Sequence, residues 1–458
     1  MEPLGTYWNP FGTTILRTYD RGVTPTQATI DAIWRIESPR LIAGLTRAVR
    51  DVGLAEDLAQ DALVSALEQW PESGVPRNPG AWLMAAAKHR AIDHWRRVKM
   101  LDRKHEELGY ELDTQRDAFD PDASLDDEVG DDLLRLVFIA CHPVLTTEAR
   151  VALTLRLLGG LKTDEIARAF LVPEPTIAQR IVRAKKTLAK ERVPFEVPRG
   201  ADLAARVSSV LEVLYLIFNE GYSATAGDDL IRPALCEEAL RLGRILAELI
   251  PDEAEVHGLV ALMSIQASRA RARVGPGGEA ILLFDQNRAL WDRLLIRRGL
   301  ASLDRARLRH GYGEASPLRQ GYGGAGPYTL QAAIAACHAR ARTPEETDWN
   351  AIVSLYDQLA ELRPSPVIDL NRAVALSMAH GPLAGLEAVD RLAGEPSLER
   401  YHLLPSVRGD LLQRLGRHAE ARAEFERAAS LTRNTREREL LLGRARACDH
   451  AAAAHRPV

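Results

Sequence analysis

The 458-residue chain has few cysteines, few aromatic residues and little net charge. Its four cysteines lie far apart without a Cys-x-x-Cys pair, a pattern that indicates neither a disulfide framework nor a structural zinc site. No apolar run approaches the roughly 18 residues that span a bilayer, and the N-terminal residues lack the core of a signal peptide. These absences predict a protein of the reducing cytoplasm, without a membrane segment.

Groups that could carry catalysis or hold a cofactor are also missing. No nucleophile, base and orienting group can be assembled from the sequence, so we expect no catalytic residue, no cofactor and no enzyme. Gly321 to Gly326 resembles a nucleotide-binding loop, but no strand precedes it, and a flexible insertion over 311–326 is the better interpretation. His142 stands beside Cys141 without a second ligand pair, which favours a packed or capping histidine and no metal site.

Helical periodicity runs through almost the whole chain and predicts an all-α fold. With 46% hydrophobic and 27% charged residues the protein should be globular, and its length suggests two to four domains. An irregular extension covers 1–25, and Pro194 and Pro198 mark a later boundary. The helices before that boundary are expected at about 26–50, 54–70, 79–98, 131–142, 146–159, 163–170 and 174–191.

Charge is distributed unevenly along this chain. Residues 88 to 104 hold seven Lys or Arg and two Asp, whereas residues 106 to 132 hold twelve Asp or Glu and one Arg. A basic block followed by an acidic block is typical of a nucleic-acid contact beside a separate segment. We interpret 106–130 as an acidic linker, because its aromatic content is too low for a core of its own.

Residues 162 to 190 have the pattern of a helix-turn-helix. Pro173 and Pro175 end the first helix and fix the entry of the second, and Thr176 stands where an N-cap or first-turn hydroxyl belongs. The second helix should bury Ile177, Ile181, Ala184 and Leu188. Its outward residues are Gln179, Arg180, Arg183, Lys186 and Lys190. Between residues 174 and 192 six Lys or Arg face two Glu, which suits a helix on the phosphates of a major groove; the alternative is an ordinary solvated helix.

The helix over 79–98 mixes aromatic and basic residues. An apolar stripe of Trp82, Leu83, Ala86, Ile92 and Trp95 is expected to be buried. The basic side chains Lys88, Arg90, Arg96, Arg97 and Lys99 would remain available for a nucleic-acid backbone. Such a mixture suits single-stranded or melted DNA, where bases stack on aromatic rings, although both tryptophans could simply belong to the core. The preceding helix, 55–70, is amphipathic and acidic, and either docks on a basic partner or is a solvated face.

The order of these segments resembles the extracytoplasmic-function (ECF) sigma factors of bacterial RNA polymerase. The resemblance covers residues 31 to 192 and is carried by the Glu-Asp-Leu-Ala-Gln-Asp-Ala-Leu helix, the helix ending Ile-Asp-His-Trp-Arg-Arg, the acidic linker and the helix-turn-helix. Phe138 to Pro143 and the Tyr215 to Tyr222 segment further resemble the subgroup with a C-terminal tetratricopeptide-like domain. The resemblance implies a region 2 helical bundle over 26–105, a region 4 domain over 131–193 and a cytoplasmic protein whose partners are core polymerase and promoter DNA.

The resemblance also implies roles for particular residues. Those expected to face core polymerase are Glu56, Asp57, Gln60 and Asp61. Those expected to bind the minus-ten region are Lys88, His89, Arg90, Arg96 and Arg97. Those expected to bind the minus-thirty-five region are Thr176, Gln179, Arg180, Arg183 and Lys186. Two positions depart from the family: His89 stands where many members have Asn lining the pocket for an extruded base, and Pro175 stands where many have Gly.

The C-terminal part has the pattern of a helical repeat. Arg408 to Gly416, followed by Ala421, Phe425 and Ala428, fits a tetratricopeptide unit, and Gly381 precedes Gly416 by 35 residues, close to the repeat length of about 34. We therefore expect an α-solenoid over 200–446, with a soluble regulatory protein as a candidate partner or a purely supporting role. The alternative function for the whole chain is a stand-alone operator-binding regulator with a solenoid interaction domain.

Overall fold

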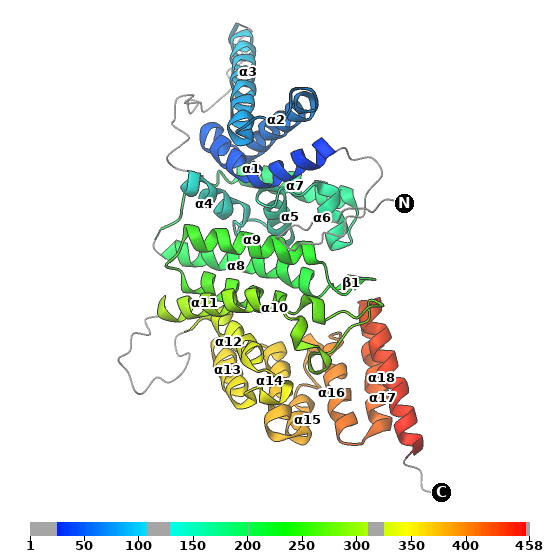
Figure 1. The fold of residues 1–458 in the computed structure, drawn as a ribbon. Helices are drawn as coiled ribbons and strands as arrows, with labels where there is room; N and C mark the ends of the chain where they lie inside the picture. The colour runs from blue at the N-terminus through cyan, green and yellow to red at the C-terminus, as the bar shows by residue number, and fades with distance from the viewer. Residues whose placement is uncertain (1–24, 108–128, 200, 310–324, 455–458) are drawn as a thin grey trace, which may run out of the picture.

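The computed structural model describes residues 25–107, 129–199, 201–309 and 325–454, and these form an almost wholly helical molecule (Figure 1). The predicted all-α class is confirmed. The N-terminal extension, the acidic linker and the Gly-rich insertion fall largely outside the described residues. Among the described helices, none is long and apolar enough to cross a membrane.

The helices follow one another along the chain in four groups. The first group is α1 (Pro25–Val49), α2 (Val52–Ser73) and α3 (Pro79–Glu107). The second is α4 (Val129–Ala140), α5 (Thr147–Leu157), α6 (Thr163–Phe170) and α7 (Glu174–Lys190). The third is α8 (Ala201–Tyr222), α9 (Pro233–Leu249), α10 (Ala254–Ala267) and α11 (Arg293–Arg309). The fourth is α12 (Pro327–Arg340), α13 (Trp349–Leu362), α14 (Pro366–His380), α15 (Pro382–Asp390), α16 (Leu403–Arg414), α17 (His418–Leu431) and α18 (Thr435–Ala454).

Two of the predicted helix ends were wrong. α2 continues past Pro71 to Ser73 and ends at Gly74, whose φ is 80°; a proline this close to the end removes only one hydrogen bond of the last turn. α3 continues nine residues beyond 98 to Glu107, because no Gly or Pro follows Val98 in that segment.

The four groups stack along the molecule, from α1–α3 at one end, through α4–α7 and α8–α11, to α12–α18 at the other (Figure 1). One continuous cluster of buried side chains extends from Ile30 on α1 to Ala375 on α14. A second, smaller core extends from Leu370 to Cys448 and joins α14 to α18. The first core therefore continues across Pro194 and Pro198, where the sequence indicated a boundary.

The predicted contact between the two helices of the last repeat unit is confirmed. A Cβ at Gly409 on α16 would come within 2.9 Å of a ring carbon of Phe425 on α17, so only glycine allows this close crossing. Phe425, Ala421 and Ala428 are fully buried. A similar close crossing occurs in the preceding helix pair, α14 and α15. A Cβ at Gly385 on α15 would lie 2.4 Å from the Ser377 Cβ on α14.

The stretch from 268 to 292 is not helical as the sequence analysis expected. It holds three short 3₁₀ turns, η1 (Ala270–Ala272), η2 (Leu283–Asp285) and η3 (Arg288–Leu290), and an isolated bridge between Val274 and Ala280. The signal was present as Gly275-Pro276-Gly277-Gly278, since such a cluster interrupts helices. Two further 3₁₀ turns, η4 (Pro344–Glu346) and η5 (Pro396–Leu398), lie later in the chain.

Two short strands connect distant parts of the chain. Among the described residues these are β1 (Ala226–Gly227) and β2 (Arg433–Asn434), which pair in parallel. β1 lies in the loop between α8 and α9, and β2 directly precedes α18. The end of the chain is therefore fixed to the α8–α9 loop.

Candidate nucleic-acid interface

The helix-turn-helix forms where the sequence predicts it. Glu165 caps α6 by accepting a hydrogen bond from the Lys162 backbone N–H at 2.8 Å. The turn after α6 passes through Leu171 in the left-handed conformation, with φ at 51°. Pro175 then occupies the first turn of α7, where its missing N–H costs no hydrogen bond.

The two faces of α7 are divided as the periodicity predicts. The four predicted apolar residues, Ile177, Ile181, Ala184 and Leu188, are all buried. Gln179, Arg183, Lys186 and Lys190 are exposed, and Thr176 and Arg180 are half-buried. The exposed part of this helix therefore carries three of its cations toward solvent.

One lysine of α7 faces the opposite way. Lys185 is half-buried, and its Nζ lies 2.5 Å from Oε2 of Glu56 on α2. Arg156 of α5 donates from Nε to the other oxygen of the same carboxylate at 2.6 Å. Glu56 is only 3% exposed. The sequence analysis missed both partners of Glu56, which is held between two cations of the second helical group.

Further ion pairs join α1 to the start of α6. Arg35 contacts Glu165 at 2.8 Å, and Lys162 contacts Asp31 at 3.3 Å. These pairs are exposed and each contributes little, but they join the same two helical groups as the buried contacts of Glu56. The first and second helical groups are thus in direct contact.

The remaining residues of the acidic face on α2 are accessible. Asp57 and Asp61 are exposed, and Gln60 is half-buried. Asp57 lies 3.6 Å from Lys185 yet keeps a side chain 76% exposed. Three of the four residues predicted to face polymerase therefore reach solvent in this arrangement, whereas Glu56 faces α5 and α7. Their role stays a prediction.

The apolar stripe of α3 differs from the predicted one. Leu83, Ala87 and Ala91 are buried, so the helix faces the core at a spacing of four residues. Trp82, Ala86, Ile92 and Trp95 were predicted to be buried but are only half-buried. Trp82 packs edge-on against the buried Trp70, with ring centroids 5.3 Å apart. Part of each half-buried tryptophan ring thus remains at the surface.

The polar residues of α3 lie along its open side. His89, Arg90 and Arg96 are exposed, and Lys88 is half-buried. Arg90 reaches the Ser65 hydroxyl at 3.4 Å, and Arg96 lies 3.7 Å from Asp93. The side chain of Arg97 falls outside the described residues. The predicted minus-ten contacts that are described can be reached from solvent.

The first of the two segments quoted for the C-terminal subgroup, Phe138 to Pro143, contacts the first half of α8. Arg206 on α8 donates to the Phe138 carbonyl at 2.6 Å, and Ser209 donates to the Cys141 carbonyl at 2.6 Å. Arg150 of α5 reaches Ser209 at 2.6 Å and Glu212 at 3.0 Å. These hydrogen bonds satisfy polar groups that packing removes from water. The second helical group, which contains the helix-turn-helix, therefore packs directly against α8.

His142 is packed in the turn between α4 and α5 and caps neither helix, which bears out the packed alternative of the prediction. Its Nδ1 accepts a hydrogen bond from the Val144 backbone N–H at 3.1 Å. Burial, with the nearby charge of Arg206, lowers the pKa of His142 to about 4, and burial raises the pKa of the Cys141 thiol to about 11. Among the described residues no group of three or more His, Cys, Asp or Glu could hold a metal ion.

The loop from Ser223 to Arg232 touches both the helix-turn-helix and the end of the chain. Arg232 donates to the Ala169 carbonyl at the end of α6 and pairs with Glu220 of α8. On the other side the buried amide of Asn434 donates to the carbonyls of Ala224 at 3.1 Å and Asp229 at 2.9 Å. The loop thus joins the helix-turn-helix to β2, directly before α18, a connection that the sequence did not predict.

Three family models match the chain in succession. Sigma-70 region 2 matches residues 33–100, and sigma-70 region 4 matches residues 135–188. A family of unknown function (DUF6596) matches residues 206–307, which extend from within α8 into α11. The first two matches correspond to α1–α3 and to α4–α7.

Three similar proteins cover different shares of the chain. The ECF RNA polymerase sigma factor SigC of Mycobacterium tuberculosis is 30% identical over 37% of this chain and 83% of the relative. The RNA polymerase sigma-E factor of Streptomyces avermitilis is 27% identical over 34% of this chain and 81% of the relative. The uncharacterized protein R00370 of Rhizobium meliloti is 44% identical over 87% of this chain and 91% of the relative. No solved structure matches.

A region 2 bundle followed by a region 4 helix-turn-helix defines a promoter-specificity subunit of RNA polymerase. The chain belongs to the ECF RNA polymerase sigma factors. As a sigma factor it binds core polymerase and promoter DNA, and this family is not one of enzymes. The tetratricopeptide-like subgroup is not confirmed, because the family matched after region 4 has no known function.

Proposed function

We propose that this sigma factor docks on core polymerase through the acidic face of α2, holds the minus-ten element open with α3 and reads the minus-thirty-five element with α7. The observation that supports this most is the exposed cationic face of α7, in the same chain as the half-buried tryptophans of α3. An operator-binding regulator would not need a strand-opening module, so the region 2 match disfavours the alternative function.

The contact between α2 and α7 would have to open during initiation. The two promoter elements are about 25 base pairs apart by their names, roughly 85 Å of duplex at 3.4 Å a step. Glu56 and Lys185 are 2.5 Å apart. We therefore propose a closed sigma factor in which the two DNA-binding regions are stored against each other, with Glu56 added to the docking surface on opening.

The C-terminal helices are proposed to form a tetratricopeptide-like interaction domain that regulates or supports the sigma regions. The helix pairs α14–α15 and α16–α17, each crossing at a buried glycine, support a repeat architecture. A soluble protein is the partner class that fits such a surface.

Charge reversal on α2 tests the docking surface. In Asp61→Lys, and more strongly in Asp57→Lys/Asp61→Lys, the affinity for core polymerase should fall by about tenfold or more, because a carboxylate facing a basic partner becomes a repelled cation. Fluorescence anisotropy of labelled full-length protein titrated with core enzyme measures this.

The matched control is Glu68→Lys/Glu72→Lys. It reverses two exposed charges with the same spacing on the same helix, outside the proposed surface. Equal losses in the two double variants, or no loss in either, would contradict the docking assignment.

A further inference from the structure

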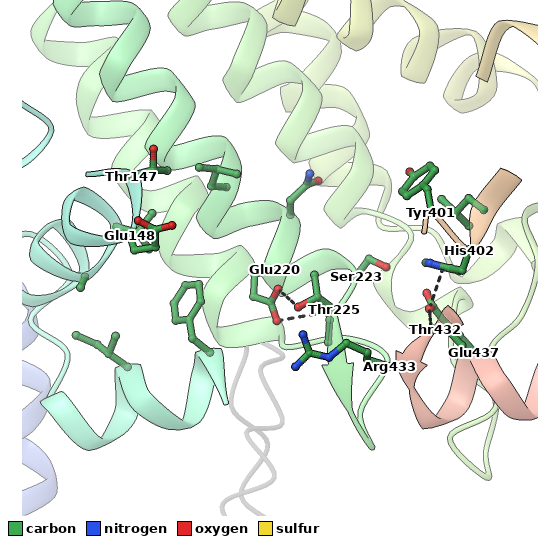
Figure 2. A pocket seen from close by; sticks show the side chains of 18 of the residues that line it. Thr147, Glu148, Glu220, Ser223, Thr225, Tyr401, His402, Thr432, Arg433 and Glu437 are labelled. Carbon is green, nitrogen blue, oxygen red and sulfur yellow. Dashed lines mark hydrogen bonds and ion pairs between the residues drawn. The ribbon is translucent and has the colours of Figure 1, made fainter. Parts of the chain in front are cut away.

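A cavity of about 930 Å³ lies between the helix-turn-helix, α8 and the last helices of the chain (Figure 2). Its volume falls in the range of small-molecule sites. The walls come from three parts of the chain that are far apart in sequence, so the cavity exists only while region 4 and the C-terminal helices are docked.

Most of the cavity wall is apolar. Val151, Ile166, Phe170 and Ile177 line it from region 4, Leu216 from α8 and Leu403 from α16. Ile166 and Ile177 also belong to the buried face of the helix-turn-helix. The body of a bound molecule would therefore contact hydrocarbon surface.

Two carboxylates of the wall already have partners within the protein. Glu220 is paired with Arg232 and accepts from the Thr225 hydroxyl at 2.9 Å. Glu437 lies 3.2 Å from His402 and accepts from the Thr432 hydroxyl at 2.8 Å. Figure 2 shows the contacts of Glu220 with Thr225 and of Glu437 with His402, with Arg433 between them in that view.

Two cations of the wall lack such partners. Neither Arg433 on β2 nor Arg180 on α7 has a hydrogen bond or ion pair from its guanidinium to any other described residue. Glu148 also lines the cavity and is exposed. Hydrogen bonds at the start of α5 lower the pKa of Glu148, and the charge of Arg180 lowers it further. Unpaired guanidinium groups beside an apolar wall fit an anion with an apolar body.

We propose that this cavity binds a small amphipathic organic carboxylate, and that its occupancy weakens reading of the upstream promoter element. The apolar body would lie against Phe170 and Leu216, with the carboxylate among the cations of the wall, Arg433 and Arg180. The regulatory half rests on the proposed function, because Arg180 belongs to the helix assigned to the minus-thirty-five element. A carboxylate that holds this guanidinium competes with DNA for it.

Calorimetric titration of the full-length protein tests binding without polymerase or DNA. Octanoate and indole-3-acetate serve as probes, each beside the neutral alcohol of the same skeleton, 1-octanol and tryptophol. We expect saturable binding of at least one carboxylate, at least tenfold tighter than its alcohol. Binding of neither carboxylate, or equal binding of acid and alcohol, would overturn the proposal whatever the protein does in transcription.

Three variants locate the site. Arg433→Gln should weaken binding of the carboxylate about tenfold, and Leu216→Trp should weaken it by placing a larger ring where the apolar body would lie. Arg400→Gln removes an exposed arginine outside the cavity and should leave binding unchanged. Retained binding in both cavity variants would place the ligand elsewhere and overturn the assignment.

A second measurement tests the coupling. Saturating carboxylate should raise the Kd of the holoenzyme for promoter DNA by about tenfold, and the effect should vanish in Arg433→Gln. An unchanged Kd at full occupancy would refute control of the recognition helix.

Discussion

Neighbouring side chains on α7 face three different surroundings. Arg183 is exposed, Arg180 lines the cavity and Lys185 contacts the buried Glu56. Since successive helix residues are rotated by about 100°, one short cationic helix can serve DNA reading, a cavity wall and an internal contact at once.

Arg183→Ala tests the proposed DNA reading at this scale. If the guanidinium reads a base edge, the substitution should cost about 1–3 kcal/mol on a promoter with the intact upstream element and little on one with that element scrambled. Filter binding of the holoenzyme to both DNAs measures the difference. Arg168→Ala on α6, which removes an exposed arginine paired with Asp164, is the control, and equal losses on both DNAs would show that Arg183 contacts only the backbone.

The sequence predicted the register of α7 but not the partner of Lys185. Apolar residues at three- and four-residue spacing fix which face is buried, and all four predicted positions are buried. Glu56, the partner of Lys185, also binds Arg156, which is 100 positions away in the sequence. Helical periodicity carries no information about contacts between residues so far apart.

At the scale of elements, α2 and α7 hold the closed form together. The carboxylate of Glu56 is 3% exposed and contacts two cations. Losing one partner of such a group costs more than losing an exposed ion pair. This contact is therefore a larger contributor to closure than the exposed pairs of α1 and α6.

Lys185→Gln should make the closed form easier to open. It removes the cation from Glu56 while leaving the acidic face of α2 intact, and a closed form weakened by about 1–2 kcal/mol would raise the apparent affinity for core polymerase by up to about thirtyfold. Hydrogen exchange of the amides in 52–73 should become faster. Lys186→Gln changes the neighbouring exposed lysine and should do neither; the same affinity and exchange in both variants would rule out the closed form as a barrier.

Helix positions could be predicted better than helix ends or irregular segments. α6 has the predicted limits, since prolines and a capping residue mark them. The end of α3 was placed too early, and the 268–292 stretch was missed despite its Gly-Pro-Gly-Gly signal. Small buried residues were a reliable guide in the last repeat unit, where Gly409 faces Phe425.

At the scale of the molecule, the C-terminal helices are packed onto region 4 and share its core. The first core cluster joins α4 and α5 to α8 and α9. Asn434, which precedes α18, donates a hydrogen bond to Ala224 in the α8–α9 loop, 210 positions away in the sequence. Neither contact could be predicted from one sequence, although the short connection after α7 indicated that the two parts lie close together. Removing everything after residue 200 would expose apolar surface of region 4.

Asn434→Ala is a milder test of the connection between the two ends. It leaves the buried carbonyl of Ala224 and the partly buried carbonyl of Asp229 without their donor, which costs about 1–3 kcal/mol. We expect faster hydrogen exchange in residues 223–232 and at the start of α18, with region 2 unchanged. Asn350→Ala, on the distant α13 and exposed, is the control, and protection that stays equal in both variants would contradict the role of Asn434.

Run-off transcription of fragmented genomic DNA with core polymerase and the full-length protein, followed by mapping of RNA 5′ ends, would show whether the protein selects promoters. The proposed function predicts new start sites, absent with core enzyme alone, that share one motif near minus ten and another near minus thirty-five. Start sites identical to those of core enzyme alone, with specific DNA binding by the protein in the absence of polymerase, would contradict it and favour an operator-binding regulator.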